Sequence, residues 1–213
     1  MALIRLAFIA LFLRPLARVF TGVDVIGAQN LPRAGPAILA ANHTSHVDTL
    51  VLLSLFPARL LPKVRPVAAA DYFLKGPLIS WFSKNLVGIV PIERAAAGQG
   101  VDVLTPLRAA LAEGAVLILF PEGTRGQPVD ELGHLKGGIA RLARDFPEAP
   151  VIPVWLQGAG RVLPKGAHLP TPLNCTALVG EPVGWRGDHQ AFLAELRERL
   201  EALKGAAPPQ RWA

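Results

Sequence analysis

Short apolar runs alternate along this chain with longer, helix-like stretches. The runs predict buried β-strands, at residues 36–41, 67–70, 88–92, 115–120, 151–156 and 174–179. The stretches between them predict helices, at residues 49–56, 77–85, 101–112, 135–145 and 190–203. Because strands and helices alternate, we expect an α/β fold in which helices flank a central sheet that is mostly parallel or mixed.

The chain begins with an apolar segment whose first 13 residues carry a single charged side chain, Arg5. It is shorter than the run of about 20 apolar residues that a membrane-spanning helix needs, and no small-residue cleavage site follows it. An interfacial helix, with Arg14 and Arg18 reaching lipid phosphates, fits this pattern better. The alternative is a helix that packs on the domain's own core. We therefore divide the chain into a membrane-interface segment (1–22), one domain (23–204) and a flexible tail (205–213).

Composition narrows the classes of partner. The 213 residues carry a net charge of +6, and 51% of them are hydrophobic. Such a basic chain suits nucleic acid, an anionic membrane or acidic substrates, but one Tyr and no basic-aromatic alternation argue against nucleic acid. The apolar content then favours a membrane surface. The lone Cys175 excludes an internal disulfide, and without a His-Glu-x-x-His pattern no metal site is implied.

A histidine and an aspartate follow the strand predicted at residues 36–41. His43 and Asp48 lie five positions apart, which on a regular helix is a rotation of about 140°, so they would not face one another. Contact requires His43 in a loop and Asp48 in the first turn of the next helix, which Ser45 can cap. His43 would then be a general base oriented by a carboxylate. An ordinary Ser-x-x-Asp capping box is the alternative, and His46 is the competing base.

A second segment, Phe-Pro-Glu-Gly-Thr-Arg at residues 120–125, follows the strand predicted at 115–120. Gly123 can supply the positive φ angle that brings backbone close to a phosphate, and Arg125 can then bind that phosphate with two hydrogen bonds. A plain turn with Arg125 in solvent is the alternative. Since His43, Arg94 and Glu122 each follow a predicted strand, we expect them at one edge of the sheet.

These segments resemble the motifs of the glycerolipid acyltransferases, the lysophosphatidic acid acyltransferase family. Asn42, His43 and Asp48 match the first motif, and residues 120–125 match another in full. Two weaker motifs occur in the expected order, at 88–94 and 151–154, so that the resemblance covers roughly residues 23–184. The resemblance implies that His43 and Asp48 are the catalytic pair. It also implies a set of substrate-binding residues: Arg94, Glu122, Gly123, Thr124 and Arg125.

One departure concerns the acceptor. Many relatives carry a lysine just after the second strand, where this chain has three alanines at residues 68–70. The resemblance therefore does not assign the contacts to the headgroup, or the identity of the acceptor. Lys136, close to the start of a predicted helix, can add positive charge.

The resemblance implies transfer of a fatty acyl group from acyl-CoA or acyl-ACP to the hydroxyl of a lysophospholipid, above all 1-acylglycerol 3-phosphate. The acyl thioester is a co-substrate, and no cofactor is expected. Direct transfer is preferred because no Gly-x-Ser-x-Gly nucleophile motif is present. We expect attachment to the cytoplasmic face of the inner membrane. The alternatives are another acceptor (glycerol 3-phosphate or a lyso-aminolipid), a thioester hydrolase, and a non-catalytic lipid-binding protein.

Overall fold

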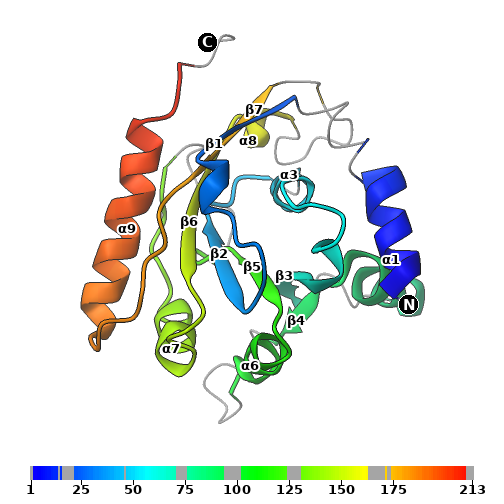
Figure 1. The fold of residues 1–213 in the computed structure, drawn as a ribbon, viewed down its shortest axis with the longest axis horizontal. Helices are drawn as coiled ribbons and strands as arrows, with labels where there is room; N and C mark the ends of the chain where they lie inside the picture. Colours follow the sequence, from blue (N-terminus) through cyan, green and yellow to red (C-terminus); the bar gives the residue numbers. More distant parts are fainter. Residues whose placement is uncertain are drawn as a thin grey trace.

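A central sheet organises the chain (Figure 1). The computed structural model describes residues 2–13, 15, 22–45, 47–70, 76–93, 102–123, 131–162, 171 and 174–209. Within these residues the sheet has seven strands, in the order β1-β7-β6-β2-β5-β3-β4. Their bounds are β1 Val23–Ile26, β2 Ala37–Ala41, β3 Val64–Ala69, β4 Val90–Ile92, β5 Val116–Leu119, β6 Val151–Gln157 and β7 Cys175–Val179. Neighbouring strands are parallel except β6 and β7, so the predicted mixed α/β sheet is confirmed.

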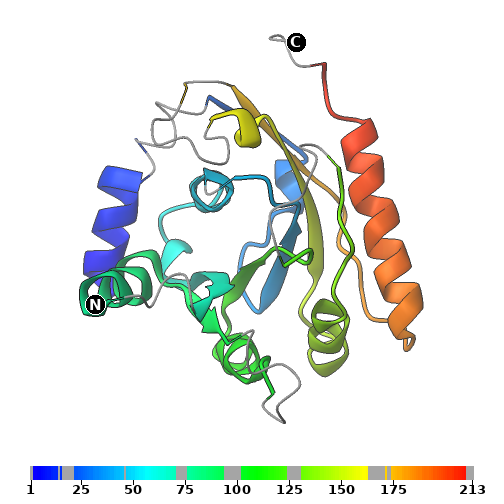
Figure 2. The ribbon, with the colours of Figure 1, turned by 180° about the vertical axis from the view of Figure 1, so that it is seen from behind.

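Helices cover both faces of this sheet (Figures 1 and 2). One face carries α3 (Val47–Ser54) and α8 (Ala159–Val162), and the N-terminal helix α1 (Ala2–Phe8) lies on the same side. The other face carries α6 (Thr105–Ala112), α7 (Gly138–Asp145) and the long helix α9 (His189–Gly205). The fold is therefore a three-layer sandwich with a hydrophobic core on each side of the sheet.

The central strand β2 shows why the apolar runs become strands. All five of its residues are buried, and its side chains alternate between the two cores: Leu39 belongs to the core under α3, and Ile38 and Ala40 belong to the core under α6 and α7. A parallel strand covered by helices on both faces must be apolar at every position. This is the pattern from which the strand was predicted.

Some predicted bounds shift for local reasons. The helix expected at 101–112 begins only at Thr105, because Pro106 fits the first turn of a helix but not its interior. The helix expected at 77–85 becomes α5 (Pro77–Phe82), followed by a π-helical turn, Ser83–Val87. The helix expected at 135–145 begins at Gly138, because residues 131–136 belong to no helix or strand and the Lys136 N–H instead donates to the Pro121 carbonyl at 2.9 Å.

The N-terminal segment packs on the domain with one side. Helix α1 continues as a π-helical turn, Ile9–Leu13, in which Ile9 is fully buried in the core under α3. The guanidinium of Arg5 donates to the carbonyl oxygens of Pro62 (2.7 Å), Val87 (3.0 Å) and Val64. Burial, with a smaller contribution from the charge of Arg65, lowers the pKa of Arg5 to about 10. The core-packing alternative therefore holds for this side of the segment.

The opposite side of the segment is apolar and open to solvent, at Ile4, Leu11 and Phe12. No helix in the described part of the chain is both long enough and apolar enough to span a bilayer.

Candidate active site

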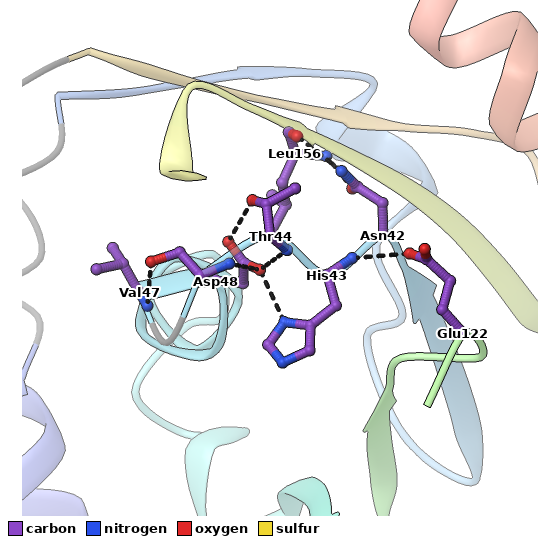
Figure 3. Close-up of polar contacts among 8 residues, drawn as sticks. Asn42, His43, Thr44, Val47, Asp48, Glu122 and Leu156 are labelled. Carbon is purple, nitrogen blue, oxygen red and sulfur yellow. Dashed lines mark hydrogen bonds and ion pairs between the residues drawn. The ribbon is translucent and has the colours of Figure 1, made fainter. Parts of the chain in front are cut away.

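His43 lies in the loop between β2 and α3, and Asp48 lies in the first turn of α3. The His43 Nδ1 atom is 2.9 Å from Asp48 Oδ2, and Figure 3 shows the ring turned toward the carboxylate. The contact that the motif implied is present, and so is the arrangement that it required: His43 in a loop and Asp48 in the first turn of the next helix.

Asp48 is completely buried, and its Oδ2 atom accepts several hydrogen bonds. The backbone N–H groups of Thr44 and Ser45 donate to it, at 2.6 and 2.8 Å. Ser45 Oγ in turn accepts from the backbone N–H of Val47 at 3.3 Å, so that Ser45 and Asp48 together cap the start of α3. The capping alternative is therefore correct as well: one carboxylate oxygen caps α3 and holds the histidine.

This arrangement fixes the tautomer of His43. Since Asp48 Oδ2 acts as an acceptor for two backbone N–H groups, the remaining partner, His43 Nδ1, is the donor. In the neutral ring the Nε2 atom then carries the lone pair, and in Figure 3 it points away from Asp48. A ring in this state can accept a proton at Nε2.

The His43 ring is also held from its face. Phe120, at the end of β5, stacks on it with ring centroids 4.1 Å apart and an interplanar angle of 19°. The His43 side chain remains 18% exposed, so that one edge stays accessible to a substrate. Carboxylate and aromatic ring together leave His43 little rotational freedom.

Glu122 holds the backbone of the site. Its side chain is only 6% exposed; Oε1 accepts the His43 backbone N–H at 3.0 Å, and Oε2 accepts the Gly133 N–H at 2.8 Å (Figure 3 draws the first). The expectation that His43 and Glu122 meet at one edge of the sheet is confirmed. A direct contact of Glu122 with substrate stays a prediction, because the contacts seen here join it to backbone.

Two contributors to the site had no assigned role in the sequence. Asn42, fully buried at the end of β2, pairs with Leu156 of β6: its amide donates to the Leu156 carbonyl at 3.0 Å and accepts the Leu156 N–H at 2.7 Å. Gly133, outside every motif, supplies the second donor to Glu122. The place of Asn42 in the first motif, directly after a predicted strand, was a usable signal, whereas the sequence around Gly133 offered none.

Gly123 has the positive φ angle, +74°, that was expected of it. A Cβ atom at this position would lie 2.7 Å from both Cε and Nζ of Lys136, so the lysine side chain rests against the glycine. The positive charge expected of Lys136 is thus located at the turn. Arg94, Thr124, Arg125 and the competing base His46 lie outside the described residues, and their predicted roles stay predictions.

Two further observations, on the Cys175 thiol and on possible metal ligands, bear on the mechanism. Cys175 is buried in β7, and burial, followed by the negative charge of Asp48, raises the pKa of its thiol to about 12. Such a thiol is a poor nucleophile at neutral pH. Among the described residues, no group of three or more His, Cys, Asp or Glu side chains could hold a metal ion.

The geometry places a histidine, held through Nδ1 by a buried carboxylate, at the carboxyl edge of the parallel strands, an arrangement that suits proton transfer. A protein-family model described as Acyltransferase matches residues 22–157, well over half of the chain. The chain belongs to the acyltransferase family.

Individual relatives agree with this assignment. The chain is 32% identical over 150 residues to a chloroplastic 1-acyl-sn-glycerol-3-phosphate acyltransferase of Arabidopsis thaliana, an alignment that covers 70% of this chain and 40% of the relative. This chain thus spans well under half the length of that relative. It is 29% identical over 187 residues to the 1-acyl-sn-glycerol-3-phosphate acyltransferase of Bacillus subtilis, covering 87% and 84% of the two chains.

A solved structure shares the fold. The crystal structure of PlsC, a 1-acyl-sn-glycerophosphate acyltransferase from Thermotoga maritima, superposes with a TM-score of 0.76 at 24% identity. The match covers 96% of this chain and 81% of the other.

Proposed function

We propose that this chain transfers a fatty acyl group from acyl-CoA or acyl-ACP to the hydroxyl of a lysophospholipid, with 1-acylglycerol 3-phosphate as the best-fitting acceptor. The observation that carries the proposal is the His43–Asp48 pair, with Nδ1 held at 2.9 Å and Nε2 directed away from the carboxylate. The Arabidopsis and Bacillus relatives, both 1-acyl-sn-glycerol-3-phosphate acyltransferases by name, support the choice of acceptor.

In the proposed mechanism, His43 Nε2 takes the proton of the acceptor hydroxyl while the hydroxyl oxygen attacks the thioester carbonyl carbon. The tetrahedral intermediate then collapses, its carbon–sulfur bond breaks, and the leaving thiolate takes the proton from His43. Asp48 holds Nδ1–H throughout and balances the charge of the protonated ring. No acyl-enzyme is needed, which agrees with the burial and raised pKa of Cys175.

The acceptor phosphate would lie beside the turn at Gly123. Lys136 is the described cation at this turn, and Arg125 follows Gly123 by two positions in the sequence. A guanidinium binds a phosphate with two parallel hydrogen bonds, which makes Arg125 the principal ligand, supported by Arg94 and Thr124. Arg125→Ala should raise the KM for the phosphorylated acceptor, and Arg125→Lys should recover only part of the loss.

A thioester hydrolase is the competing function, since the same histidine could activate water. Such an enzyme needs no phosphate ligands and would release free fatty acid at a rate independent of the acceptor. Incubating the protein with a radiolabelled acyl-CoA or acyl-ACP, with and without a panel of acceptors, separates the two. Acyl transfer to lysophosphatidic acid supports the proposal. Free fatty acid as the main product with every acceptor would refute it.

We also propose that the enzyme works on a membrane surface, at the cytoplasmic face of the inner membrane. Six large apolar side chains, 39–78% exposed, come from two segments that lie side by side in both ribbon views (Figures 1 and 2). These side chains, here called the apolar face, are Ile4, Leu11 and Phe12 of the N-terminal segment, and Leu78, Trp81 and Phe82 of α5. Phe8 and Phe82 join the segments through an edge-on ring contact at 5.3 Å. A surface of this kind, with Trp81 among its members, suits the headgroup boundary of a bilayer.

A further inference from the structure

A hydrogen bond joins the C-terminal helix α9 to the connection that carries Gly133. From α9, the Arg197 guanidinium donates through Nη2 to the Gly133 carbonyl oxygen at 2.5 Å. The same guanidinium lies 3.9 Å from Glu201 through Nη1, one helical turn further along. Arg197 therefore joins the outer helix layer to a residue that is not part of any helix or strand.

Gly133 is held on both of its peptide groups. Its carbonyl accepts from Arg197, and its N–H donates to Glu122 Oε2 at 2.8 Å. The other oxygen of Glu122 accepts the backbone N–H of His43 at 3.0 Å. Three hydrogen bonds in series thus connect a charged side chain on α9 to the backbone of the histidine.

We propose that Arg197 is a positioning residue for His43 and acts through Gly133 and Glu122. The inference rests on the function proposed above, in which His43 is the base. Within the part of the chain that the structure describes, Arg197 has its hydrogen bond with Gly133 and its ion pair with Glu201, so its effect on His43 is indirect.

The physical reason lies in the burial of Glu122. A buried carboxylate keeps its position only while its oxygens are satisfied by donors, and the oxygens of Glu122 accept from the backbone N–H groups of His43 and Gly133. If Arg197 is removed, Gly133 loses the contact that fixes its carbonyl, and its N–H is free to move away from Oε2. The carboxylate then shifts, and the N–H of His43 shifts with it.

A small displacement of His43 is enough to matter. Asp48 and Phe120 can align the ring only if the His43 backbone stays in place. A displacement of about 1 Å in a reacting group can lower the rate about 100-fold. A partial displacement, transmitted through three hydrogen bonds, should lower kcat by about tenfold. Since no substrate contact is lost, KM for both substrates should change by no more than about twofold.

The test compares Arg197→Ala and Arg197→Lys with Arg199→Ala in the full-length chain. Arg199 is a matched control: it also lies on α9, its side chain is 44% exposed against 41% for Arg197, and it pairs with Glu195 and Glu181 at 3.8 and 3.7 Å. Lysine at position 197 can still donate one hydrogen bond to a carbonyl. It should therefore restore part of the lost kcat.

One readout does not depend on any substrate. The chain has five histidines, so selective ¹⁵N-histidine labelling gives at most five backbone amide signals, and the one missing from His43→Ala identifies His43. Arg197→Ala should shift this signal, because its N–H changes its distance to Glu122, while Arg199→Ala should leave it in place. Thermal melts of both variants check that their stabilities are comparable.

A second pair of variants perturbs the same connection from within. An added Cβ at Gly133 would lie 2.7 Å from Glu122 Oε2, and Gly133 is not among the glycines with positive φ, so Gly133→Ala acts through this contact rather than through backbone strain. Gly184→Ala is the control, because nothing lies within 4 Å of its added Cβ. Gly133→Ala should shift the His43 signal further than Arg197→Ala does.

The outcomes are distinct. A shifted His43 signal with a lower kcat and unchanged KM, in Arg197→Ala but not in Arg199→Ala, supports the inference. An unmoved His43 signal, or an equal loss of kcat in both arginine variants, overturns it. If the wild-type chain shows no acyl transfer, the proposed function fails on that result alone, while the amide signal still decides whether Arg197 positions His43.

Discussion

Replacing Asp48 with Asn removes one negative charge from a completely buried position and leaves a carbonyl oxygen of similar size. The native Oδ2 atom accepts three hydrogen bonds: from the His43 ring at 2.9 Å, and from the backbone N–H groups of Thr44 and Ser45 at 2.6 and 2.8 Å. An amide oxygen can accept all three. The amide nitrogen takes the place of Oδ1, which accepts from the Thr44 hydroxyl at 3.4 Å, so the variant loses that long hydrogen bond together with the charge that strengthens the other three bonds and balances a protonated His43.

The two consequences differ in size. A hydrogen bond to a charged group contributes about 1.5–3 kcal/mol and a neutral one about 1 kcal/mol. The two backbone hydrogen bonds should each weaken by about 1 kcal/mol, so the free energy of unfolding should fall by about 2 kcal/mol. Turnover should fall by about 100-fold or more, because the protonated ring loses its counter-charge during proton transfer.

Urea denaturation gives the free energy of unfolding, and kcat is measured with labelled acyl donor and corrected for the folded fraction. Asp188→Asn serves as the control, since Asp188 caps a different helix, α9, by accepting the Ala191 N–H at 2.6 Å. That variant should lose some stability and keep its turnover. If Asp48→Asn behaves in the same way, losing stability but not turnover per folded molecule, the carboxylate only caps α3 and the reasoning is refuted.

Three further predictions concern other parts of the molecule. Gly123→Ala should lower the melting temperature because φ is +74°, and it should raise KM for the phosphorylated acceptor because the new Cβ would displace the Lys136 side chain. Unchanged kinetics would show that this turn is not part of the acceptor site. The free energy of unfolding should decline between pH 9.0 and about 12, because the Cys175 thiol ionises there in the unfolded chain but stays protonated in the folded one. In Cys175→Ala this decline should be absent, while turnover at pH 7 should be unchanged. Trp81→Ser on the apolar face should weaken co-sedimentation with anionic vesicles at an unchanged melting temperature, whereas Ile9→Ala should lower the melting temperature by removing a buried side chain; equal vesicle binding by Trp81→Ser and wild type would contradict the assigned face.

Much of the fold could be predicted from the sequence because parallel strands covered on both faces are apolar throughout. The strand β2 is buried at all five positions, and its apolar run stands out against the polar loop that follows. The edge strand β1 was missed for the converse reason: its residues are half-buried or exposed, and Val-Asp-Val-Ile is too short and too mixed to indicate a strand. Its partner β7 runs antiparallel to β6, a direction that apolar runs do not encode.

Only part of the candidate site could be predicted from the sequence. Contact between His43 and Asp48 could be predicted from the resemblance of their motif, and their spacing then required His43 in a loop and Asp48 at the start of a helix. The roles of Gly133 and Arg197 could not, because one contributes a backbone N–H and the other binds a backbone carbonyl, groups that every residue near them also carries. Gly133 and Arg197 are 64 positions apart in the sequence, and the packing of α9 on the sheet brings them together.

The central claim is that His43 is the base, and its most direct test is the turnover of His43→Ala in the presence of lysophosphatidic acid and acyl thioester. The His43 side chain caps no helix, so the variant should fold, which a thermal melt verifies. The account predicts a loss of turnover of about 100-fold or more with KM little changed, and a milder effect for His46→Ala. Near-normal turnover in well-folded His43→Ala would contradict the mechanism.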